Sequence, residues 1–148
     1  DGLIPHEERW VWFARGVGVE RDELYSSCGS VATRKLLLTY RNLCSSSNCA
    51  VGAAAMYAYE SRIPEISHTK LKGLQQCYGI SDEESLRFFR EHMIADIEHS
   101  KTWALLISQM ATTEEIQMQI EESAAKAARS LWRMLDGVCE QCGIPVTN

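Results

Sequence analysis

The chain has 148 residues, of which 45% are hydrophobic and 24% are charged, values typical of a soluble globular protein of one domain and not of a disordered one. Fifteen basic and twenty acidic residues give a net charge of −5 with no basic run, which argues against nucleic acid and anionic membrane as partners. The longest apolar run, near 50–58, is far below the roughly twenty residues of a bilayer span, and no leader pattern is present, so we expect a cytoplasmic protein.

The first third of the chain predicts helices separated by turn residues. Pro5 stands where the first turn of a helix tolerates proline, and Gly16 and Gly18 end the apolar pattern that begins there. Ser30 can cap a later helix, and a serine-rich connector ending in Asn48 supplies the next N-cap. The helices expected in this part run from Pro5 to about Gly16, over 21–25 and over 31–44.

The remaining sequence predicts longer helices. From Cys49 onward it is rich in alanine and glycine, whose small side chains let a neighbouring helix approach closely, and Glu60 closes the inward face. Pro64 interrupts or kinks this pattern. Two capping boxes, Ser81–Glu84 and Thr112–Glu115, each precede a long apolar pattern of helical period. The expected helices start at 49, 65, 81 and 112 and end near 63, 78, 110 and 142, and because nothing alternates with period two we predict an all-α bundle.

The helix expected from residue 81 carries polar groups on its inward face. Phe88, His92, Asp96, His99 and Trp103 follow one another at intervals of three or four residues, so they share a stripe. Such a stripe normally enters the core, where an imidazole or a carboxylate is costly unless it is paired or binds a metal. The spacing therefore predicts a buried polar site.

A second helix can complete this site. If the helix that ends at Glu60 packs antiparallel to the one with the stripe, as short connections favour, Glu60 can face His92, Asp96 and His99. Bundles build dinuclear iron or manganese sites from such carboxylates and imidazoles, and these ligands need no thiolate. The alternative is a buried hydrogen-bonded network without metal. His68, between Ser67 and Thr69, is interpreted as a hydrogen-bonded histidine and not as a ligand.

The six cysteines are an even count, but the chain is neither short nor loop-rich enough for a disulfide scaffold. We expect free thiols in a reducing compartment. Cys139 and Cys142 have CxxC spacing, which is also found in redox pairs and zinc sites. No second CxxC accompanies them, so we interpret them as a structural pair.

Resemblance to a known family rests on three segments, MYAYESRIPEISHTKLKGLQQCYGI, RFFREHMIADIEHSKTW and LWRMLDGV. They resemble the haem-oxygenase-like di-iron oxidase superfamily, which includes the TenA and PqqC proteins, and within it the group typified by the chlamydial protein associating with death domains. The resemblance implies a haem-oxygenase-like helical bundle, of which residues 1–148 would be the C-terminal two-thirds, with the first helices before Asp1. It also implies a homodimer.

The same resemblance implies a ligand set for two metal ions, Fe/Fe or Fe/Mn. An early glutamate of the family has no counterpart here, so either it precedes Asp1, as we expect, or one metal position is weakened. The family's early histidine matches His6 in HEERWVWFARGVG. The implied metal ligands are His6, Glu60, His92, Asp96 and His99.

The resemblance further implies an oxidase that uses dioxygen and an external reductant. Proteins of this group resemble enzymes that make para-aminobenzoate for folate from their own tyrosine, with a lysine as nitrogen donor. Lys70 matches that lysine, and Tyr59 adjoins Glu60. The consumed tyrosine is expected upstream of Asp1. A solvated lysine and a packing tyrosine are the alternatives for these two residues.

Two other functions stay open on the same scaffold. One is a metal-free enzyme like the TenA aminohydrolases or the cofactorless PqqC oxidase, against which the set of carboxylates and imidazoles argues. The other is an interaction protein that binds a partner of the death-domain type, for which the charge distribution indicates no interface.

Overall fold

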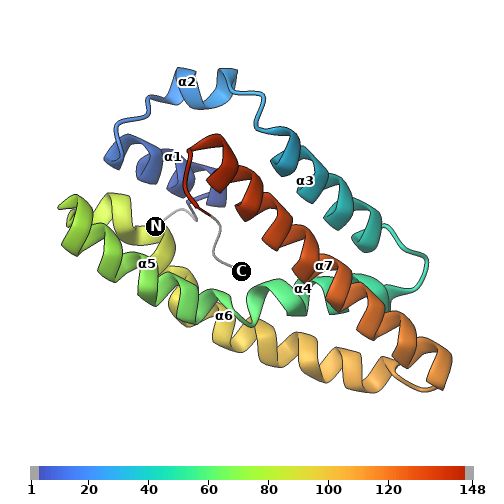
Figure 1. Cartoon of the computed structure of the whole chain (residues 1–148). Coiled ribbons are helices and arrows are strands. Elements are labelled where there is room, and N and C mark those ends of the chain that lie inside the picture. Colours follow the sequence, from blue (N-terminus) through green and yellow to red (C-terminus); the bar gives the residue numbers. More distant parts are fainter. Residues whose placement is uncertain (1–3, 146–148) are drawn as a thin grey trace. The chain divides into compact units, whose positions relative to one another are not determined.

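The computed structural model describes residues 4–145, and in this range the chain is helical without strands, as the sequence predicts. None of the helices in this range is both long and apolar enough to cross a bilayer. The chain divides into two compact units, Asp1–Cys28 with Arg62–Glu98, and Gly29–Ser61 with His99–Asn148. The single domain stays a prediction. The helices are α1 (His6–Gly16), α2 (Arg21–Ser26), α3 (Val31–Cys44), α4 (Cys49–Glu60), α5 (Ile63–Tyr78), α6 (Glu83–Met110) and α7 (Glu114–Gln141) (Figure 1).

The predicted caps of α3 and α4 are confirmed. The Ser30 hydroxyl accepts a hydrogen bond from the backbone N–H of Thr33 at 3.0 Å. The Asn48 side chain accepts one from the N–H of Ala50 at 3.0 Å. Each bond satisfies a donor that the first helical turn would otherwise leave without a partner.

The two predicted capping boxes each begin one residue later than expected. The carboxylate of Asp82 accepts from the N–H of Ser85 at 2.8 Å, and the hydroxyl of Thr113 accepts from Ile116 at 3.2 Å. Neither third helical residue is a glutamate, so the reciprocal bond of a capping box cannot form. The N–H of Thr112 instead bonds the carbonyl of Met110 in the turn that ends α6.

Aromatic side chains hold α1 against the first half of α6 in the first unit. The ring centres of Trp10 and Phe88 lie 4.3 Å apart, and those of Phe13 and Phe89 lie 5.0 Å apart. Phe89 is 2% exposed. Such aromatic pairs contribute about 0.5–1.5 kcal/mol each beyond the burial of their area. The cluster therefore fixes the two helix segments that carry His6 and His92.

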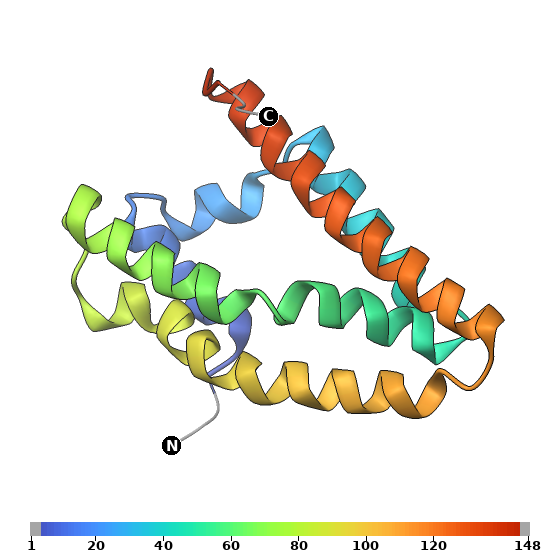
Figure 2. The ribbon, with the colours of Figure 1, turned by 60° about the horizontal axis from the view of Figure 1, so that its bottom comes forward.

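In the second unit, α7 packs along α3 and α4 (Figure 1). Leu43, Ala55 and Ala127 form its buried core, and the hydroxyl of Ser123 donates to the carbonyl of Val51 at 2.6 Å. The alanines of α4 permit this close approach, as the sequence predicts. Figure 2 shows α4, in green, alongside the second half of α6, in orange. This arrangement sets the end of α4 beside the middle of α6.

Helix α7 also approaches α3 closely, at Gly137. A Cβ added there would lie 2.5 Å from the Cβ of Ala32, and a methyl group cannot rotate away. We expect Gly137→Ala to lower the free energy of unfolding by about 1–3 kcal/mol. The matched control is Gly73→Ala, where an added Cβ meets nothing within 4 Å and stability should rise by up to about 1 kcal/mol. Chemical denaturation checks both, and equal effects would contradict the close approach.

Candidate metal centre

Glu60, the last residue of α4, anchors the centre in the second unit. Its side chain is 15% exposed. The Oε2 atom accepts a hydrogen bond from the indole N–H of Trp103 at 2.7 Å. The same oxygen lies 3.8 Å from Nδ1 of His99. The packing of α4 on α6 thus brings a carboxylate to a histidine 39 residues further along the sequence, which sequence reasoning predicted only on the assumption of antiparallel packing.

Asp96 lies one turn before His99 on α6. Because this helix is continuous, its own geometry places the two side chains on the same face. One ligand atom from each of Glu60, Asp96 and His99 lies within 4.8 Å of the other two. These three side chains form a candidate group for holding one cation.

The burial of these groups differs from the expectation of a wholly buried stripe. Asp96 is 3% exposed, as predicted for a carboxylate facing inward. His92 is partly buried. The side chain of His99 is 54% exposed, so the prediction is wrong for this residue. Two side chains one turn apart on α6 therefore differ widely in exposure.

The tautomer of His92 suits a metal ligand. Its Nδ1 lies 2.7 Å from the carbonyl oxygen of Phe88, one turn earlier. A carbonyl can only accept, so Nδ1 carries a proton, and in the neutral imidazole Nε2 then keeps its lone pair. Ligating histidines are usually held in this way, by a bond from the ring nitrogen that does not bind the metal. The ring also stacks on Phe88, with the centres 4.0 Å apart.

His6, the first residue of α1, approaches His92 within the first unit. Their ring centres lie 5.0 Å apart and the rings meet edge to face, at 77°. His6 is exposed. The fold therefore pairs the two histidines, although neither their spacing nor the sequence around His6 indicates such a pair.

Carboxylates and imidazoles are the ligands that iron and manganese accept, so the residues present fit such metals. His92, Asp96 and His99 follow one another at i, i+4 and i+7 on α6, and the rest of the set approaches this helix from α1 and α4. The fit depends on the chemistry of the donors and on the tautomer of His92.

Lys70 lies on α5, with its Nζ atom 5.4 Å from the centre of the Phe89 ring. The residue as a whole remains exposed, but burial of the amine lowers the pKa of Lys70 below its ordinary value. A larger share of its amine is therefore neutral at a given pH. The role of Lys70 as a nitrogen donor, and the alternative of a solvated lysine, stay predictions.

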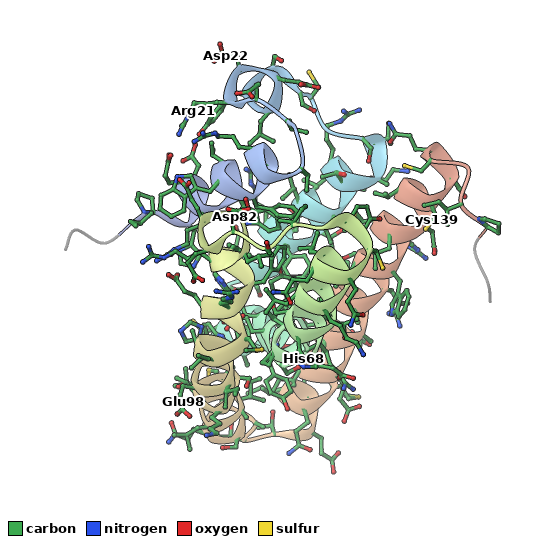
Figure 3. The ribbon with its side chains drawn as sticks, turned by 90° about the vertical axis from the view of Figure 1, so that its left-hand side faces the viewer. Arg21, Asp22, His68, Asp82, Glu98 and Cys139 are labelled. Carbon is green, nitrogen blue, oxygen red and sulfur yellow. The ribbon has the colours of Figure 1, made fainter. Side chains whose placement is uncertain are left out.

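Tyr59 precedes Glu60 on α4 and meets Tyr40 of α3 edge to face, with ring centres 6.2 Å apart. Burial of the hydroxyl is the main cause that raises the pKa of Tyr40, to about 12, and the nearby Tyr59 is a smaller cause. His68 lies on α5 and is exposed, and no role at the centre follows from its position (Figure 3).

Sequence reasoning also missed the hydrogen bond of Trp103. The sequence placed Trp103 in the stripe but predicted no partner for its indole N–H. The available signal was its spacing of four residues from His99, which sets both on one face of α6. The partner of the indole N–H is a carboxylate on α4, and which residue takes that place depends on how α4 and α6 pack.

Non-haem metal proteins of the helical-bundle class build their sites from carboxylates and imidazoles on facing helices, as is seen here. Residues 4–132 match the model of a protein family described as iron-containing redox enzymes. The chain belongs to this family, and the predicted all-α, haem-oxygenase-like fold is thereby confirmed.

Curated relatives carry the name 4-aminobenzoate synthase. The one from Nitrosomonas europaea is 34% identical over 139 residues, which are 94% of this chain and 56% of the relative. The one from Chlamydia trachomatis is 31% identical over 147 residues, 96% of this chain and 63% of the relative. The one from Chlamydia muridarum is 30% identical over 140 residues, which are 95% of this chain and 58% of the relative. This chain thus spans about three-fifths of the length of these relatives, and the predicted resemblance is confirmed.

Proposed function

We propose that this chain holds the metal ions of an iron-dependent 4-aminobenzoate synthase. The observation that carries the proposal is the approach of Glu60, Asp96 and His99 to within 4.8 Å of one another. The names of the relatives, which match more than nine-tenths of this chain, support the product. The family description supports iron.

In this proposal Glu60, Asp96 and His99, with His92 and His6, hold two metal ions, either two iron ions or one iron and one manganese. The two carboxylates offset part of the positive charge of the metals. The Nε2 atom of His92 is free to bind because Nδ1 is engaged by Phe88. Bound iron would supply one-electron chemistry and open positions for dioxygen, with electrons from an external reductant.

The other residues of the chain prepare the surroundings. Phe88 and Phe89, both less than 10% exposed, keep water away from His92 and from the amine of Lys70. Lys70 supplies the nitrogen of the product, because its depressed pKa favours the neutral amine. A tyrosine of the protein itself supplies the aromatic ring. The proposed role of Tyr59 at the centre rests on its place directly before Glu60 in the sequence.

The test is product formation by the complete natural chain. Protein loaded anaerobically with ferrous iron is mixed with dioxygen and a chemical reductant, and 4-aminobenzoate is measured by liquid chromatography and mass spectrometry. We expect product from the iron-loaded sample and none from the metal-free or zinc-loaded samples. Undiminished product from metal-free protein would instead support a cofactorless enzyme like PqqC.

The predicted partners stay predictions. A homodimer is expected. Light scattering during size-exclusion chromatography measures the mass of the particle in solution and so tests this prediction. A partner of the death-domain type is a separate prediction, which a binding measurement with an isolated death domain tests.

A further inference from the structure

The indole of Trp103 makes a directed contact with the carboxylate of Glu60. The Nε1 atom lies 2.7 Å from Oε2. The indole N–H can only donate and an ionised carboxylate can only accept, so the direction of this bond is unambiguous. Hydrogen bonds to an ionised group are shorter and roughly twice as strong as those between neutral groups.

The position of Trp103 lets it act on Glu60 and His99 together. Trp103 follows His99 by one turn of α6, so both side chains leave the same face of the helix. The indole at 2.7 Å is the nearer neighbour of Oε2, and the imidazole lies 3.8 Å away. Both residues and Glu60 belong to the same compact unit. The partly buried indole is itself held in the packing between α4 and α6.

We propose that Trp103 is a positioning residue of the metal centre, acting through Glu60. This inference rests on the proposed function, because it takes Glu60 to be a ligand. Glu60 is the last residue of α4, and the N–H of the following Ser61 still bonds the carbonyl of Tyr57. The indole N–H holds Oε2, and because an ionised carboxylate has about four lone-pair sites, this one bond leaves others for a cation. A carboxylate held in advance loses less conformational entropy when it binds a metal.

Removing such a supporting bond typically weakens metal binding 10- to 100-fold. The test is the equilibrium affinity for ferrous iron, measured anaerobically by competition with a chromophoric chelator. We expect Trp103→Phe to weaken binding by roughly 10- to 100-fold. The matched control is Trp132→Phe, the same substitution at a tryptophan of α7 that is 68% exposed, and it should leave the affinity unchanged.

A second variant separates the hydrogen bond from the shape of the ring. Benzothienylalanine at position 103 keeps the outline of tryptophan and replaces only the N–H by sulfur. We expect it to weaken iron binding as much as Trp103→Phe does, and to change the visible spectrum of the cobalt-substituted protein. Wild-type affinity in this variant would overturn the inference, because the ring would then act by packing alone.

The outcomes for the two proposals differ. If the unmodified protein binds iron and both variants at position 103 bind it equally well, the positioning role is wrong and the proposed function stands. If the unmodified protein binds no iron, the proposed function and the role of Trp103 are both wrong.

Discussion

Replacing Asp96 by asparagine should lower the affinity for iron by more than roughly 100-fold, a larger loss than the 10- to 100-fold typical of supporting residues. Asp96 is 3% exposed and reaches Glu60 and His99 with a ligand atom, so it is the least solvated acid of the centre. Asparagine keeps the size of the side chain but removes its charge. Iron content by elemental analysis and affinity by chelator competition measure the effect.

The matched control for this variant is Asp136→Asn on α7, an acid outside the centre, which should keep normal iron binding. Circular dichroism of both variants should match that of the unmodified protein, because neither substitution changes volume. Full iron content in Asp96→Asn would remove Asp96 from the ligand set.

Replacing Lys70 by arginine should reduce 4-aminobenzoate formation by more than about 100-fold while leaving iron content unchanged. A guanidinium keeps a cation near Phe89, but its pKa is so high that it offers no neutral amine. Lys70 is suited to give up nitrogen because burial lowers its pKa. Mass spectrometry of the product made by protein labelled with nitrogen-15 lysine gives the source of the nitrogen.

The control is Lys72→Arg, two residues along α5 and therefore on a different face, which should keep normal product formation. Intact-mass measurement of active protein after turnover should detect a changed side chain at position 70. An unmodified Lys70 in protein that has made product would contradict its role as donor.

The helices could be predicted from local signals because their caps are local. Ser30 and Asn48 bond backbone groups within three residues of themselves, so sequence alone specifies them. The caps of α6 and α7 were predicted one residue too early. At the start of α7, Thr112 and Thr113 are chemically identical, and it is the hydroxyl of Thr113 that accepts from Ile116.

The candidate site was predictable to the extent that it lies on one helix. The spacing of His92, Asp96 and His99 on α6 suffices to put them on one face. The approach of Glu60, the bond from Trp103 and the exposure of His99 depend on how α4 packs against α6. No periodicity within either helix encodes that packing. The pairing of His6 with His92 likewise depends on contacts between α1 and α6.

The most direct test is X-ray diffraction at the iron absorption edge from crystals of the iron-loaded protein. The account predicts an anomalous peak at coordination distance from side-chain atoms of Glu60, Asp96 and His99. A map with no peak there, or with these three side chains turned apart into solvent, would contradict it.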